Sequence, residues 1–300
     1  MKLKEIMIAA LSIILLAGQY SCTSETRGPA PTLAEAMEAE YAGIYDSPVR
    51  LDGGRFEGEP FAEGGAVRPT VELLGDLFMT GDIGMDGTDE SAVFLIENSG
   101  GTGSFLYLAL LERRGGAVRN TGTLMIGDRT QVRDFQIEAG RMIVDVIQHD
   151  PEDGMCCPTR KTRRTWKLVE NDIVEEEPIL SGNISTADLQ GIEWVLKMID
   201  SDDVISGDTP VTLLLSDGRI SGVSGCNRYF ADIEESSPGE IRIGMAGSTR
   251  MACPEEVMDV EKRYLDALQG RVRYSFLSGK LALTCRAGDG PVTLVFTRGE

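Results

Sequence analysis

The chain has 300 residues, with 29 Lys or Arg, 48 Asp or Glu and a single His, so its formal net charge at pH 7 is −19. This acidity argues against nucleic acid as a partner, because counterion release needs clustered basic side chains on the protein. With one histidine, no nucleophile elbow and no phosphate-binding glycine motif, the sequence indicates a protein that is not an enzyme.

The N-terminus predicts export. Lys2 and Lys4 precede an apolar run over residues 6–17, and polar residues follow from Gln19. This order is typical of a secretory signal peptide, which we place at residues 1–21. The apolar run is shorter than the roughly 20 residues that a membrane span needs. We therefore expect an exported protein located in the cell envelope, in the periplasm or outside the cell.

Cys22 lies where a bacterial lipoprotein carries its acyl chain, and residues 22–31 have the composition of a polar tether. The preceding residues, Gln19 to Ser21, lack the leucine that lipoproteins favour three positions before the cysteine. We predict lipidation of Cys22, with a cleaved soluble form and an uncleaved signal anchor as alternatives. A lipid or a signal anchor would make the membrane a partner of the N-terminus.

A first domain of antiparallel β structure is expected over residues 32–172. A helical stretch at residues 33–41 leads into it, and glycine-rich turns then separate strand-like runs. These runs cover residues 92–97, 105–111, 117–123, 131–138, 141–148 and 164–169. Acidic residues, a proline and a Ser-Gly-Asn turn mark residues 173–188 as a linker to a second domain at residues 189–298.

One acidic loop of the first domain has a spacing similar to that of calcium sites. Asp82, Asp86, Asp89 and Glu90 offer carboxylates at short intervals, and Gly87 permits a sharp turn. Gly84 stands where an oxygen ligand is needed, however, and no bidentate glutamate follows at the twelfth position. We expect an acidic turn without a cofactor, and keep calcium as the alternative.

The adjacent pair Cys156 and Cys157 leaves several possibilities open. The two residues can form a vicinal disulfide, pair with separate partners such as Cys285, or bind a metal together with His149. Disulfide chemistry is favoured, because zinc normally takes four nitrogen or sulfur ligands and the chain has one histidine. No Cys-x-x-Cys spacing supports a redox catalyst.

The C-terminal third carries a specific series of motifs. It opens with Leu189-Gln190-Gly191-Ile192-Glu193-Trp194, continues with Gly225-Cys226-Asn227 and Thr249-Arg250-Met251-Ala252-Cys253-Pro254, and ends in a helix followed by three strand-like runs. In this order the motifs resemble the META (HslJ-like) domain family. The resemblance implies an α+β domain, in which a mixed sheet folds into a partial barrel with one packed helix. Through the pieces at residues 81–87, 99–105, 127–132 and 155–159, the first domain is similar to the region that precedes META domains in some secreted bacterial and archaeal proteins.

The family resemblance also implies a setting. META domains are associated with the cell envelope, heat shock, stress and drug tolerance, without a defined activity. The family resemblance places Cys226 and Cys253 in the two strongest motifs. We therefore expect these two cysteines to form a disulfide, with two buried thiols as the alternative. Asn227, Arg228, Arg250 and Met251 are the candidate binding surface, unless they serve only to shape the fold.

The favoured hypothesis is a lipid-anchored envelope protein with a structural or binding role and an envelope protein as partner. The alternatives are a calcium-dependent surface-binding module and a secretion pilot that holds a peptide or lipid. An envelope hydrolase is the least favoured, because no convergent set of catalytic groups is apparent.

Overall fold

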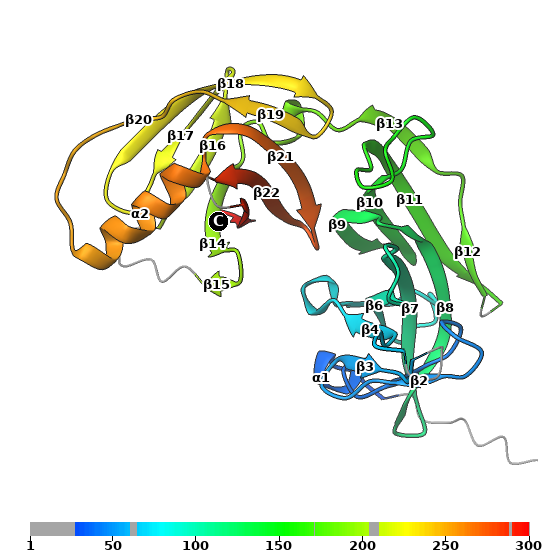
Figure 1. Ribbon diagram of the computed structural model, residues 1–300. Coiled ribbons are helices and arrows are strands. Elements are labelled where there is room, and N and C mark those ends of the chain that lie inside the picture. Colours follow the sequence, from blue (N-terminus) through cyan, green and yellow to red (C-terminus); the bar gives the residue numbers. More distant parts are fainter. Residues whose placement is uncertain (1–27, 61–64, 171, 204–209, 288–289, 300) are drawn as a thin grey trace, which may run out of the picture.

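The computed structural model describes residues 28–60, 65–170, 172–203, 210–287 and 290–299. These residues form two β-rich bodies that lie side by side (Figure 1). The predicted signal peptide and Cys22 lie outside the described residues. Within the described residues, no helix is both long enough and apolar enough to cross a membrane.

The first body consists mainly of two antiparallel sheets. One has the order β3-β4-β6-β7-β8 with β5 beside β6, and the other has the order β12-β11-β10-β9 with β13 beside β11. The strands of the first are β3 (Arg55–Glu57), β4 (Thr70–Leu73), β5 (Met79–Gly81), β6 (Glu90–Asn98), β7 (Phe105–Arg114) and β8 (Ala117–Asp128). Those of the second are β9 (Gln131–Glu138), β10 (Arg141–Gln148), β11 (Arg160–Val169), β12 (Asp172–Glu175) and β13 (Ile179–Asn183). The predicted strand-like runs all lie within these strands.

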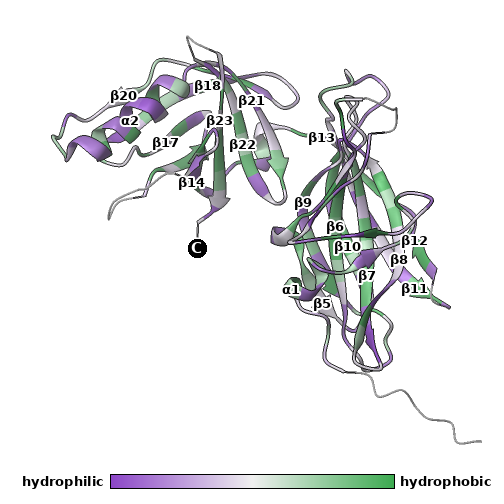
Figure 2. Cartoon of the chain, turned by 60° about the horizontal axis from the view of Figure 1, so that its bottom comes forward, coloured by the Kyte–Doolittle hydropathy of each residue, from purple (hydrophilic) through white to green (hydrophobic). Residues whose placement is uncertain are grey.

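The sheet containing β6 and β7 is buried on both faces. Phe94 and Leu108 pack with Trp166 between the two sheets, whereas Val93 and Leu95 belong to a cluster on the opposite face. Alternate side chains of a strand point to opposite faces, so a strand covered on both sides needs a continuous apolar run. This explains why residues 92–96 lack the polar alternation of a half-exposed strand. Figure 2 shows the hydrophobic residues gathered on these strands.

The opposite face is covered by α1 (Leu33–Ala36) and the pair β1 (Glu40–Tyr41) and β2 (Val49–Arg50), whereas Leu77 of the turn η1 (Gly75–Leu77) packs between the two sheets. The predicted helix over residues 33–41 was wrong beyond its first turn. Thr32 and Glu35 form a capping box that starts the helix. The chain then pairs with the segment after it, since Leu51 donates from its N–H to the Ala39 carbonyl at 3.0 Å. One helical turn has little stability of its own, so tertiary pairing decides where it ends.

The second body is a closed barrel. β14 pairs with both β16 and β23, which closes the order β14-β16-β17-β18-β19-β21-β22-β23 into a ring. Its elements are η2 (Thr186–Asp188), β14 (Glu193–Ile199), β15 (Asp202–Asp203), β16 (Thr212–Ser216), β17 (Arg219–Val223), β18 (Arg228–Ser237), β19 (Glu240–Ile243), β20 (Gly247–Ser248), α2 (Glu255–Ala267), β21 (Gly270–Leu277), β22 (Lys280–Ala287) and β23 (Gly290–Arg298). The expected partial barrel is thus a closed one, and its described strand pairs are antiparallel rather than mixed.

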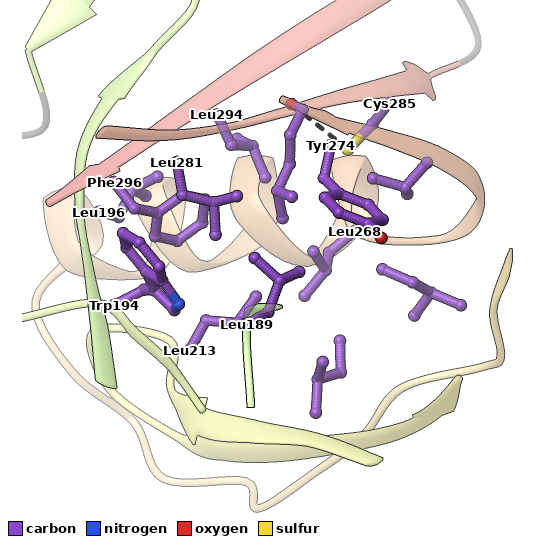
Figure 3. Close-up of a cluster of buried hydrophobic side chains, with 14 of the residues drawn as sticks. Leu189, Trp194, Leu196, Leu213, Leu268, Tyr274, Leu281, Cys285, Leu294 and Phe296 are labelled. Atoms are coloured by element: carbon purple, nitrogen blue, oxygen red, sulfur yellow. Dashed lines mark hydrogen bonds between the residues drawn. The ribbon is translucent and has the colours of Figure 1, made fainter. Parts of the chain in front are cut away.

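Large apolar side chains fill the barrel (Figure 3). Trp194 and Phe296 are fully buried, as is Tyr264 of α2. The ring of Tyr264 lies 5.4 Å from that of Tyr229 and 6.3 Å from that of Phe296, centroid to centroid. Such edge-to-face pairs fix the position of α2 on the barrel.

The expected linker over residues 173–188 belongs partly to the first domain. β12 and β13 both pair with β11, so the chain adds to the second sheet before it enters the barrel. The glutamates and the proline of this stretch are compatible with short edge strands, which commonly carry charges or proline. Composition alone therefore misplaced the boundary.

The two domains are held together by backbone and polar contacts. The N–H of Phe276 donates to the side-chain oxygen of Gln131 at 2.8 Å, and that of Gly279 donates to the Val132 carbonyl at 2.9 Å. Ile147 of β10 is buried within the hydrophobic cluster of the barrel. β9 and β21 consequently face each other across the junction.

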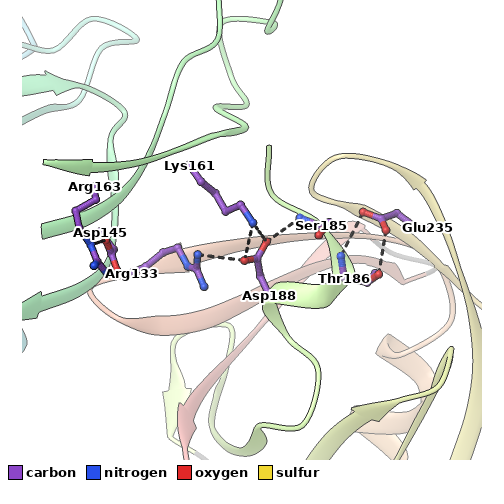
Figure 4. A network of polar contacts seen from close by, with 8 residues as sticks. All are labelled: Arg133, Asp145, Lys161, Arg163, Ser185, Thr186, Asp188 and Glu235. Atoms are coloured by element: carbon purple, nitrogen blue, oxygen red, sulfur yellow. Dashed lines mark hydrogen bonds and ion pairs between the residues drawn. The ribbon is translucent and has the colours of Figure 1, made fainter. Parts of the chain in front are cut away.

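Asp188 is the centre of the polar network at this junction (Figure 4). Its carboxylate accepts from Lys161 Nζ at 3.0 and 3.1 Å and from the Ser185 N–H at 2.9 Å, and it forms an ion pair with Arg133 at 3.2 Å. Its side chain is only 9% exposed. A carboxylate with this many donors, two of them cationic, orients the barrel relative to the first domain.

Candidate functional site

The C-terminal motifs meet at a buried carboxylate, that of Glu261 on α2. It accepts hydrogen bonds from Ser224 Oγ at 2.7 Å, from the Asn227 N–H at 2.8 Å and from Asn227 Nδ2 at 2.9 Å. Burial by itself raises the pKa of Glu261, but these hydrogen bonds outweigh it and hold the pKa below its usual value. The Glu261 side chain is therefore an ionised carboxylate fixed within the protein.

Asn227 joins the turn before β18 to the segment that leads into α2. Its side-chain oxygen accepts from Thr249 Oγ1 at 2.8 Å and from the Met251 N–H at 2.7 Å. The disulfide between Cys226 and Cys253, with a Cα–Cα distance of 6.0 Å, links the same two segments covalently. The expected pairing of these cysteines is therefore present in the structure.

Asn227 does not belong to a binding surface, because only 2% of its area is exposed. Asn227 was predicted to contact a partner, but it is an internal residue. Its side chain accepts a hydrogen bond from the backbone of the neighbouring segment at Met251. A buried amide with both ends bonded is a common means of fixing irregular chain segments.

The other three candidate binding residues do lie on the surface. Arg228 and Arg250 are exposed, and Met251 is 57% exposed. Arg228 and Arg250 come from neighbouring segments, since the Thr249 N–H donates to the Arg228 carbonyl at 3.0 Å. Phe230, 52% exposed, points to the same face of β18 as Arg228 and was missed by sequence reasoning. We name Arg228, Phe230, Arg250 and Met251 the arginine–methionine patch.

The alternation of β18 could have identified Phe230. Tyr229 and Ala231 are buried while Arg228, Phe230 and Asp232 are exposed. A large aromatic residue among the exposed positions of an alternating strand is informative, because the opposite face already has its core residues. Arg219 of β17 further positions the ring, with its guanidinium 5.2 Å from the centroid of Phe230.

The acidic loop uses its carboxylates on its own backbone. Asp82 accepts from the N–H groups of Asp86 and Gly87 at 2.9 and 3.0 Å. Glu90, 6% exposed, accepts from those of Ile83 and Gly84 at 3.0 and 2.9 Å. Burial, the largest influence, raises the pKa of Glu90.

The expected turn is therefore present in detail, and the four acidic residues have different surroundings. Asp89 is exposed, whereas Glu90 points inward. Among the residues that the structure describes, no group of three or more His, Cys, Asp or Glu side chains is arranged to hold a metal ion.

The remaining cysteines within the described residues also have defined states. Cys156 and Cys157 are bonded to each other, so the vicinal disulfide is the arrangement present among the alternatives considered. Cys285 is a free thiol, fully buried, and burial raises its pKa to about 12. Cys285 is thus neither a disulfide partner nor an accessible nucleophile.

Comparison with known proteins supports the prediction of a META domain in the C-terminal part of the chain. The family model of the META domain matches residues 187–298. No curated protein matches the chain. One solved NMR structure, of a protein from Burkholderia xenovorans, is similar at 27% identity over 41% of this chain and 94% of that chain, with a TM-score of 0.32. A second NMR structure is similar at 22% identity over 38% of this chain and 94% of that chain, also with a TM-score of 0.32.

Proposed function

We propose that this protein is a binding or structural component of the cell envelope without enzymatic activity, tethered by a lipid on Cys22. The META match supports an envelope-associated protein of unclear activity. We further propose that the protein is tethered to the membrane and has a role in envelope stress or drug tolerance. The arginine–methionine patch would be the surface that contacts an envelope protein.

The division of the C-terminal motifs into inward and outward residues carries the proposal. Ser224, Asn227 and Glu261 bond to one another inside the domain, so these polar groups serve the fold. Arg228, Arg250 and Met251 project outward from the segments that this network and the disulfide fix. A rigid support under exposed arginine, aromatic and methionine side chains is favourable for binding, because the backbone that carries them is already ordered and does not lose further conformational entropy on association.

A photo-crosslinking residue placed at Met251 tests the surface. Met125 of the first domain is the matched control, because it is 55% exposed compared with 57% for Met251. We expect discrete crosslinked species from position 251 in intact cells, none of them shared with position 125. The double substitution Arg228→Glu and Arg250→Glu should abolish them. Crosslinks that survive this charge reversal would contradict the proposal.

The tether is tested separately by intact-mass spectrometry of the protein from its native membrane fraction. A mature chain that begins at Cys22 and carries acyl mass is the expected result. Cys22→Ser should release the protein from the membrane fraction. An unmodified Cys22 in the mature protein would refute lipid anchoring while leaving the surface open to its own test.

A further inference from the structure

We propose that the disulfide between Cys156 and Cys157 is a thiol–disulfide exchange site at the domain junction, with Cys156 as the sulfur that is attacked and Cys157 as the leaving thiolate. The partner it fits is a dithiol reductant of the kind carried by thiol–disulfide oxidoreductases. This site is separate from the arginine–methionine patch and does not depend on it.

The loop between β10 and β11 presents the two sulfurs in a defined place. Asp153 organises the loop by accepting from the N–H and hydroxyl of Thr159 at 2.7 and 2.8 Å and from the Asp150 N–H at 2.8 Å. The Cys157 N–H donates to the Gly154 carbonyl at 3.0 Å. The disulfide is thus part of an ordered turn.

A cavity of about 390 Å³ between the two domains adjoins the disulfide. Its walls come from the loop of the first domain and from β19 and β21 of the barrel, including Glu240 and Arg273. Cys156 is exposed, whereas Cys157 is partly covered. A reductant therefore reaches the Cys156 sulfur more readily, and access is one of the factors that decide which sulfur is attacked.

Arg273 makes the two sulfurs electrostatically unequal. Its Nη1 lies 2.7 Å from Cys157 Sγ and 3.6 Å from Cys156 Sγ. A neighbouring guanidinium stabilises a thiolate and lowers the pKa of the corresponding thiol. Since a thiol of lower pKa is the better leaving group, cleavage with departure of Cys157 is favoured.

The exchange balances without a further reactant. A thiolate of the external dithiol attacks Cys156 Sγ, the bond between the two cysteines breaks, and its electron pair leaves on Cys157 Sγ beside Arg273. The second thiolate of the reductant then attacks the first sulfur of the reductant, which is bonded to Cys156 in the mixed disulfide. This closes the disulfide of the reductant and releases Cys156 as a thiolate. The protein disulfide has gained two electrons, the dithiol has become a disulfide, and protons from the two external thiols balance the two cysteine thiolates.

The charges around the cavity narrow the choice of reductant. Asp150, Glu152, Asp153 and Glu240 line it together with Arg273; Asp150 forms an ion pair with Arg160 and Glu240 forms one with Arg271, so these four acids exceed the three arginines by one negative charge. Acidic walls disfavour the approach of reductants with a net negative charge at ordinary ionic strength. A neutral dithiol, or a protein with a basic rim around its dithiol, is therefore favoured over glutathione.

The other three cysteines that the structure describes lack this combination of exposure and a neighbouring guanidinium. Cys226 is 6% exposed and its backbone bonds to Glu261, and Cys253 is half-buried, so both cysteines of the second disulfide are less open to attack than Cys156. Cys285 is a buried free thiol that burial keeps protonated, so it does not supply an internal thiolate. One exchangeable disulfide and one resistant disulfide are expected in the same chain.

The first test measures how fast dithiothreitol reduces the native full-length protein, with alkylation and mass spectrometry reporting each cysteine. We expect the Cys156–Cys157 bond to be reduced first. Arg273→Gln should slow its reduction by about three- to tenfold, because the leaving thiolate loses its countercharge. Arg273→Lys should restore most of the rate. Arg271→Gln is the matched control, because it removes the same charge two residues away on β21, where the exposed Arg271 pairs with Glu240 of the cavity wall at 3.4 Å and not with either sulfur.

A second test needs no substitution and so does not depend on how a variant folds. The neutral monothiol 2-mercaptoethanol is used to trap the mixed disulfide, and tandem mass spectrometry locates the adduct. Adduct on Cys156 supports the assignment. Adduct predominantly on Cys157, earlier reduction of Cys226–Cys253, or equal rates for Arg273→Gln and Arg271→Gln would overturn it.

Discussion

The two disulfides in the described part of the chain stand in different surroundings, and the contrast shows how much the environment of a bond determines its role. Cys226–Cys253 connects residues separated by 27 positions and lies against the Ser224–Asn227–Glu261 network. Cys156–Cys157 connects neighbours at the junction of two domains, beside a cavity and a guanidinium. The first bond restrains the fold, whereas the second closes no chain segment and is open to solvent. Stability and chemistry are thus assigned to different cysteine pairs.

The largest effect should come from removing the Glu261 carboxylate beside the Cys226–Cys253 disulfide. Glu261→Ala removes the acceptor of the buried Asn227 N–H, and it leaves Ser224 Oγ and Asn227 Nδ2 with only the carbonyls of Asn227 and Met251 as acceptors. Lost charge-assisted hydrogen bonds and unsatisfied donors should lower the free energy of unfolding by about 3–5 kcal/mol. Urea unfolding measures this loss of free energy. The signal is the fluorescence of Trp194, in a Trp166→Phe background that leaves Trp194 as the single tryptophan. Glu256→Ala, at an exposed position of the same helix, should change stability by less than about 0.5 kcal/mol; similar losses for both variants would contradict the role given to Glu261.

Removal of each disulfide tests the comparison directly. Replacing Cys226 and Cys253 by serine should destabilise the protein by about 3 kcal/mol, since closing a chain segment of this length reduces the entropy of the unfolded state. The same replacement of Cys156 and Cys157 should cost less than about 1 kcal/mol, because adjacent residues close almost no chain. Thermal unfolding of the two double variants measures the loss of stability caused by removing each disulfide. Equal losses would show that the vicinal disulfide has a fold-restraining role of its own.

The pH dependence of two buried glutamates should have opposite signs. The pKa of Glu261 is lowered in the folded state, so its contribution is present above the unfolded pKa and is lost as pH falls through the folded pKa. The pKa of Glu90 is raised, so its ionisation disfavours the folded state as pH rises through the unfolded pKa and then the folded one. Glu261→Gln should destabilise the protein by about 2 kcal/mol at neutral pH and by less in acid.

Glu90→Gln should show the opposite pH dependence of stability from Glu261→Gln. Its stability relative to the wild type should be most favourable at neutral pH and should decline as the pH falls. Melting temperatures of both variants across acid to neutral pH supply the measurement. Parallel profiles for the two substitutions would remove the distinction between the barrel carboxylate and the carboxylate of the acidic loop.

The smallest effect is expected from calcium. Asp82 and Glu90 already accept two backbone hydrogen bonds each, so binding the cation would compete with the turn that they stabilise. Millimolar calcium should shift the melting temperature by less than about 1 °C relative to chelator. A rise of several degrees that disappears in Asp82→Asn would establish the loop as a calcium site.

Much of the secondary structure was predictable because its signals are local. The apolar runs around Phe94 and Leu108, the alternation of β10 and the proline before α2 each indicate an element within a few residues. The order of motifs from Trp194 to the final strand was sufficient to predict a META domain, and the family match covers residues 187–298. The pairing of Cys226 with Cys253 followed from that resemblance.

Other features depend on contacts that no local pattern contains. Asn227 points inward because Glu261, far along the chain, supplies its partner. β12 and β13 belong to the first domain because β11 has room to pair with both. The closure of the barrel likewise depends on β14 meeting β23.

The sequence by itself determined the acidic composition, the positions of most strands and the adjacency of Cys156 and Cys157, because each is a property of residues close together in the chain. Only the tertiary structure decided that Arg273, 116 residues from Cys157, lies beside its sulfur. The domains meet through a few polar and backbone contacts, such as those of Asp188 and Gln131, which have no periodicity to detect. The reactivity proposed for the vicinal cysteines therefore arises from the docking of the two domains.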